Sequence, residues 1–211
     1  MNDPKLIERY EPADRINHWV VAITFLLLAA SGLALFHPSL FFLSNVLGGG
    51  PWTRILHPFL GVVMFVAFAA LALRFWRHNI VDECDEQWLK QWRDVINKRE
   101  AQLPESGRYN AGQKVLFWVM VACLLVLLLS GLVIWQPYFA PWFNITAVRI
   151  AVVLHAIAAF LLILGIIVHI YAAIWVKGSV RAMIRGYVTA AWAKQHHRAW
   201  YKELTSARPR D

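Results

Sequence analysis

Charged side chains are scarce in this chain of 211 residues: 16% are Asp, Glu, Lys or Arg, whereas 59% are hydrophobic. A typical soluble domain has about a quarter charged residues, so the composition excludes an ordinary soluble protein. No charged residue occurs in four stretches, at positions 16–53, 55–73, 115–135 and 150–176. Each stretch is long enough for a helix that crosses about 30 Å of hydrocarbon.

Cysteine is nearly absent as well, with Cys84 in a polar segment and Cys123 in an apolar one. Their spacing matches no cysteine metal motif, and no Cys-x-x-Cys-His sequence exists for covalent attachment of haem. A cleavable signal peptide is not expected, because the first apolar stretch follows a charged segment and lacks a small-residue cleavage site. We find no internal repeat and no low-complexity tract.

The four uncharged stretches also lack the polar stripe that marks the helices of a soluble bundle. We therefore predict an all-α membrane protein, a four-transmembrane-helix bundle that forms one domain over residues 1–211. The helices are expected at about 17–36, 54–75, 113–135 and 149–176. A loop at 76–112 and a tail at 177–211 complete the chain.

Lys and Arg residues are distributed unevenly between the connecting segments. Three precede the first helix, eight lie at 74–114 and eight follow position 176, whereas Arg54 and Arg149 are alone in the other two connections. The positive-inside rule then places both termini and the loop at 76–112 in the cytoplasm. The net charge of +8 is explained by topology, so we expect no nucleic-acid partner.

The connecting segments are rich in aromatic residues, as expected near lipid headgroups. The two outer connections combine Trp, Tyr and Phe with proline-containing turns. The inner loop mixes charges with Trp76, Trp88 and Trp92, which predicts one or two helices along the inner membrane face.

Four histidines lie inside the predicted helices, where ionisable residues are rare and usually functional. His155 and His169 are 14 residues apart in one helix, which is almost four turns and roughly 21 Å of rise. With the orientation above, His57 matches the outer depth of His155, and His18 matches the inner depth of His169. Two imidazole pairs at two depths predict bis-histidine ligation of two b-type haems.

Other residues near the predicted helices have less specific roles. Gly61 and Gly165 each lie one turn from a paired histidine, and a flat macrocycle between helices needs such gaps, although glycine also serves helix packing. The remaining histidines are expected at the surface or the membrane interface: His37, His78, His196 and His197.

Several sequence segments resemble the cytochrome b (gamma) subunit of membrane-bound respiratory formate dehydrogenase, over nearly the whole chain. The segments that carry the resemblance are Arg15-Ile16-Asn17-His18-Trp19, Arg54-Ile55-Leu56-His57-Pro58-Phe59, Gly107-Arg108-Tyr109-Asn110 with Gly112-Gln113-Lys114, Trp135-Gln136-Pro137-Tyr138-Phe139-Ala140-Pro141, Leu154-His155, His169-Ile170-Tyr171-Ala172-Ala173, Trp175-Val176-Lys177-Gly178 and Ala191-Trp192-Ala193-Lys194-Gln195-His196-His197.

This resemblance implies a multi-pass subunit of the bacterial inner membrane that holds two haem b groups. His57 and His155 would bind the outer haem iron, and His18 and His169 the inner haem iron. The implied partners, on the periplasmic side, are an iron–sulfur (beta) subunit and a catalytic (alpha) subunit with molybdenum or tungsten. Electrons from formate would pass from the outer haem to the inner haem and then to menaquinone or ubiquinone. The chain contains no catalytic residues for formate oxidation itself.

The resemblance also places a quinone site near the cytoplasmic face, at Asn110, Gly112, Gln113 and His169. Gly112 would let a ring approach the backbone closely, and Gln113 offers a donor and an acceptor to a quinone carbonyl. A second interpretation makes Asn110 and Gly112 a turn at the start of a helix and Gln113 an ordinary interfacial residue.

Two alternative functions stay open from the sequence. The chain could serve a membrane-bound hydrogenase or another periplasmic oxidoreductase, because the cytochrome does not contact the substrate. It could also be a haem-free transporter or membrane anchor, although transporters of this kind often contain inverted repeats.

Overall fold

The computed structural model describes residues 5–97, 99 and 102–206. The chain forms two compact units. We call the first the bundle unit, which comprises Ile16–Leu73 and Val119–His169. The second, the terminal unit, comprises Met1–Arg15, Arg74–Trp118 and Ile170–Asp211. Both ends of the chain and the long middle segment therefore belong to the same unit.

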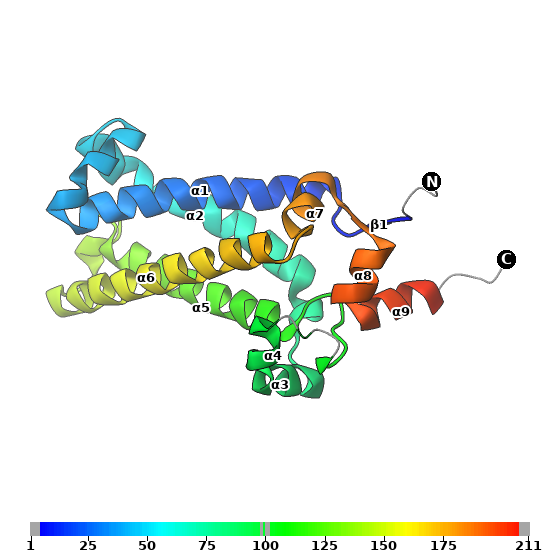
Figure 1. Ribbon diagram of the computed structural model, residues 1–211. Helices are drawn as coiled ribbons and strands as arrows, with labels where there is room; N and C mark the ends of the chain where they lie inside the picture. Colours follow the sequence, from blue (N-terminus) through cyan, green and yellow to red (C-terminus); the bar gives the residue numbers. More distant parts are fainter. Residues whose placement is uncertain (1–4, 98, 100–101, 207–211) are drawn as a thin grey trace. The chain divides into compact units, whose positions relative to one another are not determined.

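Four long helices dominate the structure (Figure 1): α1 (Pro12–Phe36), α2 (Gly50–Phe75), α5 (Ala111–Ile134) and α6 (Ile145–Trp175). All four are long and apolar enough to cross a membrane, which confirms the four predicted helices. A helix suits these stretches because it satisfies its backbone N–H and C=O groups internally, without water. The start of α2 lies upstream of the expected position because Pro51 favours the first turn of a helix.

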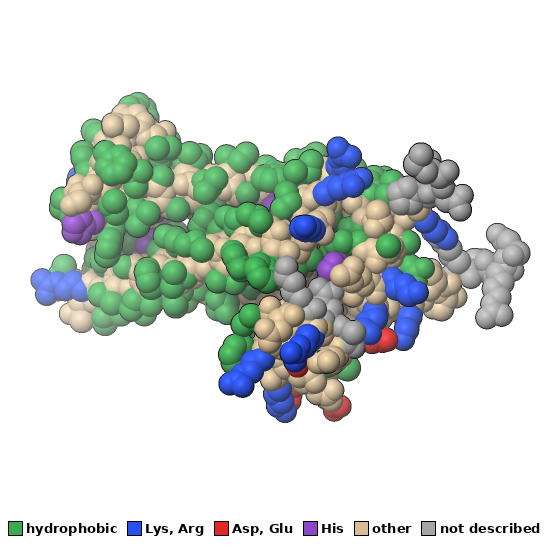
Figure 2. Space-filling model, in the orientation of Figure 1, with side chains coloured by type: hydrophobic (Ala, Val, Ile, Leu, Met, Phe, Trp, Pro, Cys, Tyr) green, Lys and Arg blue, Asp and Glu red, His purple; other side chains and the backbone are tan. Residues whose placement is uncertain are grey.

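The outward surfaces of these helices are apolar. In the most apolar window of each helix, at most 22% of the residues are buried within the chain. Val66, Phe160 and Ile167 are each more than half exposed, at 63%, 61% and 57%. Figure 2 shows hydrophobic side chains over the long helices, whereas Lys and Arg gather over the shorter helices of the terminal unit. A multi-pass membrane protein explains this surface, because lipid tails cover it.

All four long helices contribute to the core of the bundle unit. The buried cluster consists of Leu28, Met64, Phe68, Cys123, Leu124 and Leu162. Cys123 is thus a small apolar core residue, as expected for a buried free cysteine.

A glycine-rich turn joins α1 to α2 after the 3-10 helix η1 (Pro38–Leu47). Gly48 and Gly49 have φ angles of +90° and +96°, a backbone region that strongly favours glycine. Thr53, which is fully buried, donates its hydroxyl to the Ser44 carbonyl at 3.1 Å. The glycines at 48–50, for which the sequence pattern suggested no role, therefore end η1 and start α2. A shorter 3-10 helix, η4 (Ala140–Trp142), lies between α5 and α6.

The terminal unit is built from short elements. Its middle segment contains η2 (Trp76–Asn79), α3 (Glu83–Lys90) and α4 (Trp92–Ile96), and its C-terminal segment contains α7 (Ser179–Arg185), α8 (Ala190–His196) and α9 (Arg198–Ser206). Two strands, β1 (Leu6–Glu8) and β2 (Tyr187–Thr189), pair antiparallel with Ile7 opposite Val188. This small sheet, which the hydropathy pattern did not indicate, joins the two ends of the chain.

Candidate haem sites in the bundle unit

Two pairs of histidines lie close together in the bundle unit. The ring centres of His57 on α2 and His155 on α6 are 6.4 Å apart. Those of His18 on α1 and His169 on α6 are 6.3 Å apart. The structure thus brings together the residues that the sequence paired by depth, and α6 contributes one histidine to each pair.

The separation within each pair fits two imidazoles on opposite sides of one metal ion. Two metal–imidazole bonds of about 2 Å each, plus about 1 Å from each coordinating nitrogen to its ring centre, give a separation of about 6 Å. Among the described residues, no group of three or more His, Cys, Asp or Glu side chains could hold a metal ion. Each candidate site therefore offers two ligands, as a porphyrin iron requires.

The surroundings of the histidines leave room for a flat ligand. All four imidazoles are only partly buried. Gly61 lies one turn after His57, and a Cβ atom added there would meet no other atom within 4 Å. The ring separations and the partial burial therefore fit a bound haem at both pairs, and the open space at Gly61 adds to the fit at the His57–His155 pair.

Serine hydroxyls contact both histidines of the His57–His155 pair, which we call the outer pair after its predicted depth. The Oγ of Ser31 on α1 lies 2.7 Å from Nδ1 of His57. The Oγ of Ser130 on α5 lies 3.0 Å from Nδ1 of His155. In both contacts Nε2 stays available to a metal, and a second residue orients the ring, as is common around metal-binding histidines.

The inner pair has a different environment. This pair, named for its predicted depth, is His18 with His169. Nδ1 of His18 is buried and has no hydrogen-bond partner among the described residues, and the ring packs edge-on against Trp19 at 5.5 Å. The neighbouring Asn17 donates its side-chain amide to the Ala67 carbonyl on α2 at 2.9 Å. Packing and the attachment of α1 to α2 position this histidine, and no hydroxyl in the described part of the chain hydrogen-bonds it.

Three of the four residues predicted to bind quinone lie in the terminal unit, and His169 lies in the bundle unit. The Asn110 backbone N–H donates to Oε1 of Gln113, and the Gln113 N–H donates to Oδ1 of Asn110, both at 3.0 Å. This reciprocal cap starts α5; the second interpretation expected a helix start here but gave Gln113 no part in it. A Cβ on Gly112 would lie 3.4 Å from the Trp88 indole. Nε2 of the exposed Gln113 has no partner among the described residues and can still donate.

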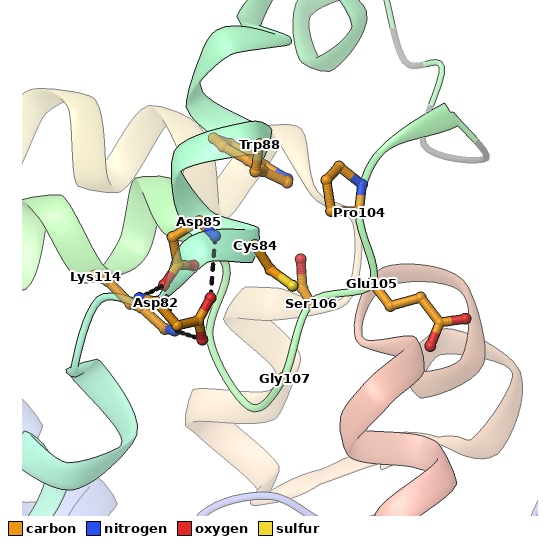
Figure 3. Close-up of a pocket in the computed structure, with 9 residues that line it drawn as sticks. All are labelled: Asp82, Cys84, Asp85, Trp88, Pro104, Glu105, Ser106, Gly107 and Lys114. Carbon is orange, nitrogen blue, oxygen red and sulfur yellow. Dashed lines mark hydrogen bonds and ion pairs between the residues drawn. The ribbon is translucent and has the colours of Figure 1, made fainter.

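A small cavity in the terminal unit is lined by charged side chains that form ion pairs (Figure 3). Lys114 Nζ lies 2.6 Å from Asp85 and 3.2 Å from Asp82. Burial alone would raise the pKa of Asp82, but hydrogen bonds from the Asp85 backbone and from Lys114 lower it. Glu105 pairs with Lys202 at 2.7 Å. The contacts of Lys114 attach α3 to the start of α5, and the Glu105–Lys202 pair attaches the middle segment to α9. We assign the cavity a structural role.

His197 is buried, with 2% of its surface exposed, so its expected surface position was wrong. Its Nδ1 lies 2.9 Å from the Gly107 carbonyl, and its Nε2 lies 3.2 Å from Nη2 of Arg9. A carbonyl can only accept and a guanidinium can only donate, so this histidine is neutral, with its proton on Nδ1. Burial and the adjacent Arg9 lower its pKa to about 3.

Ser31 and Ser130 are the site residues that sequence reasoning missed. One signal was available, since both are followed by Gly-Leu and each precedes the paired histidine by 25 or 26 positions. A hydroxyl in an apolar helix usually bonds its own backbone, so the sequence pattern alone did not indicate a histidine contact.

Comparison with known proteins gives matches over most of the chain. Residues 9–186 match the family described as prokaryotic cytochrome b561. The formate dehydrogenase cytochrome b556(fdo) subunit of Escherichia coli (strain K12) is 48% identical over 198 residues, which cover 94% of this chain and 93% of the relative. The nitrate-inducible formate dehydrogenase cytochrome b556(Fdn) subunit of the same organism is 44% identical over 207 residues, with coverages of 98% and 95%. The formate dehydrogenase cytochrome b556 subunit of Haemophilus influenzae is 44% identical over 202 residues, with coverages of 96% and 84%.

Proposed function

This chain belongs to the prokaryotic cytochrome b561 family, among the cytochrome b subunits of formate dehydrogenase, and we propose that it transfers electrons across the membrane through two b haems. The observation that carries this proposal is the pair of imidazole separations, 6.4 Å and 6.3 Å, in the bundle unit. A transporter or an anchor has no need for two such pairs.

The histidines have separate tasks in this proposal. His57 and His155 bind the iron of the outer haem, and His18 and His169 bind the iron of the inner haem. Haem, when bound, supplies a one-electron carrier within an apolar environment. Because α6 carries both His155 and His169, its rise of roughly 21 Å over 14 residues sets the distance between the two sites.

The proposed direction is from the periplasm to the cytoplasm. Lys and Arg number 19 in the termini and the middle loop against two in the other connections, which favours cytoplasmic termini. Four spans require both termini on one side, and both belong to one compact unit. The names of the relatives support an assembly with formate dehydrogenase subunits. We therefore propose an iron–sulfur subunit and a molybdenum or tungsten catalytic subunit at the periplasmic face of a bacterial inner membrane.

We further propose a quinone site near the inner haem, with Asn110, Gly112, Gln113 and His169. The resemblance of the segment around Gln113 supports it, together with the unused Nε2 donor of this side chain. Reduction of menaquinone or ubiquinone there takes protons from the cytoplasm. Electrons from the periplasm then separate charge across the membrane and contribute to the proton motive force.

Replacing one histidine of each pair tests the haem assignment. In the complete complex, His57→Ala should remove the outer haem and leave the inner one, and His18→Ala should do the reverse. Each variant should contain half the haem b of the wild type, with a different component missing from the low-temperature visible spectrum. His37→Asn is the control, because His37 lies outside the pairs and Asn keeps an N-cap acceptor for η1.

The same spectra separate the alternatives. Absence of haem b from the wild-type complex would support a transporter or an anchor. Loss of the same spectral component in both variants would show that the ligands are paired wrongly. Reduction of the haems by hydrogen and not by formate would assign the chain to a hydrogenase.

A further inference from the structure

The two outer histidines each contact a Ser-Gly dipeptide, and the two dipeptides belong to different helices. Ser31-Gly32 on α1 contacts His57, and Ser130-Gly131 on α5 contacts His155. Besides the serine contacts, a Cβ added to Gly32 would lie 3.4 Å from Cε1 of His57, and one added to Gly131 would lie equally near Cε1 of His155. Each ring therefore lies against the bare glycine backbone, with Nδ1 directed at the preceding serine.

The hydrogen bonds of the serines decide which nitrogen of each histidine carries the proton. A hydroxyl has one proton to donate. Ser31 is 2.7 Å from the Leu27 carbonyl, and Ser130 is 2.5 Å from the Val126 carbonyl. Because the serine protons go to these carbonyls, each Oγ accepts from the Nδ1–H of the histidine. Nε2 of both outer histidines is then unprotonated, with its lone pair free for iron.

The inner pair has no equivalent. Nδ1 of His18 is buried without a partner, and neither ring of the inner pair has a hydroxyl partner among the described residues. The outer ligands thus each donate a hydrogen bond from Nδ1, whereas Nδ1 of His18 has no acceptor among the described residues. A histidine that donates from Nδ1 is a more basic ligand, and a more basic ligand favours ferric over ferrous iron.

We propose that Ser31 and Ser130 are positioning residues that lower the midpoint potential of the outer haem relative to the inner haem. The inference rests on the proposed assignment of the outer haem to His57 and His155. This difference in potential favours inward electron transfer, because an electron then passes from the outer haem to a haem of higher midpoint potential.

Redox titration of the haems in membranes that contain the complete complex tests this role. Ser31→Ala and Ser130→Ala should each raise the midpoint potential of the outer haem and leave that of the inner haem unchanged. Loss of the residue that hydrogen-bonds a metal ligand typically lowers metal affinity or activity by about 10- to 100-fold. A tenfold change in the ferric–ferrous equilibrium corresponds to about 59 mV for one electron. The outer haem is identified as the component that is missing in His57→Ala.

Matched variants separate positioning from general packing. Thr24→Val removes another buried hydroxyl of α1, which donates to the Val20 carbonyl at 2.7 Å and has no histidine partner; neither potential should change. Ser31→Thr and Ser130→Thr keep the hydroxyl, so the outer haem should have the wild-type midpoint potential in both variants. Loss of the outer haem alone in the alanine variants, with recovery in the threonine variants, also supports the positioning role.

Three outcomes would overturn the inference: an unchanged outer potential, equal shifts of both haems, or a similar shift in Thr24→Val. In each case a content of two haems per copy of this chain, with one lost in His57→Ala, would leave the proposed function intact. A wild-type complex without two haems would instead contradict the proposed function.

Discussion

Hydroxyl side chains inside the membrane helices show how a polar residue can have one or two tasks. Thr24, Ser31 and Ser130 each donate a proton to the carbonyl four residues earlier. This bond removes the cost of burying the hydroxyl, about 1–3 kcal/mol for an unsatisfied polar group. The oxygen lone pairs then remain available for a second partner. At Ser31 and Ser130 that partner is a histidine, and at Thr24 the position on the helix offers none.

Gln113 also combines two tasks, and two substitutions separate them. Gln113→Glu keeps the oxygen that caps the Asn110 N–H and removes the amide donor proposed for the quinone. We expect both haems to be retained and their reoxidation by quinone to slow about tenfold, which corresponds to a hydrogen bond of about 1.4 kcal/mol. The measurement is stopped-flow reoxidation of formate-reduced haems in membranes.

Gln113→Leu removes the cap as well, so it should slow reoxidation similarly and also destabilise the start of α5 by about 1 kcal/mol. Wild-type reoxidation in Gln113→Glu would leave this residue with a capping role only.

The short elements of the terminal unit depend on a buried arginine and a neutral histidine. Arg9 follows β1, is 3% exposed, and donates to the Arg108 carbonyl at 2.8 Å. Its guanidinium lies 5.0 Å from the ring centre of Trp192 and 4.9 Å from that of Trp200. Cation–π contacts of this kind stabilise by about 0.5–2 kcal/mol each. Together with the strand pair, they hold the N-terminal segment to α8 and α9.

Acid should destabilise this part of the structure, because its folded state requires the His197 side chain beside Arg9 to be neutral. The pKa of His197 is lowered to about 3, whereas an unfolded histidine has a pKa of about 6.5. The contribution of neutral His197 to the stability of the folded state is fully present above pH 6.5 and is lost as the pH falls toward 3. At pH 5 the loss is about 2 kcal/mol.

Hydrogen exchange of residues 186–206, corrected for the intrinsic rate at each pH, should be faster at pH 5 than at pH 7. His197→Gln keeps a neutral acceptor for Arg9, so its exchange should change less between the two pH values. An equal change in both proteins would show that another group causes the acid response.

At the scale of the whole molecule, the chain combines an apolar bundle with basic terminal and middle segments. Arg54 and Arg149 are the exceptions, each at the start of a long helix at the same end of the bundle unit. Because the short connections contain one positive charge each and the other segments 19 in total, the asymmetry favours a single orientation. The proposed direction of electron and proton movement depends on this orientation.

Reporter fusions test the orientation. Green fluorescent protein fused after Ser206 should fluoresce, because it folds in the cytoplasm and not after export. Alkaline phosphatase inserted at Gly49 or after Trp142 should be active, because it needs the periplasm for its disulfides. Phosphatase activity of a fusion after Ser206 would reverse the orientation and place the quinone site on the opposite face.

Local properties of the sequence predict much of this protein. The four helices follow from uncharged stretches, because a membrane leaves the backbone no other way to satisfy its hydrogen bonds. The depths of His18, His57, His155 and His169 follow from the fixed rise of a helix. The mutual cap of Asn110 and Gln113 is equally local, since its partners are three residues apart.

Tertiary packing decided the rest, because it sets how each helix is rotated about its own axis. That rotation brings His57 within 6.4 Å of His155 and gives each outer ring a serine partner from another helix. It also leaves Nδ1 of His18 without a hydrogen-bond partner in the described part of the chain. The burial of His197 and the pairing of β1 with β2 join segments that are far apart in the chain. Hydropathy and helical spacing report only neighbours along the chain, and these contacts depend on side chains that meet across the fold.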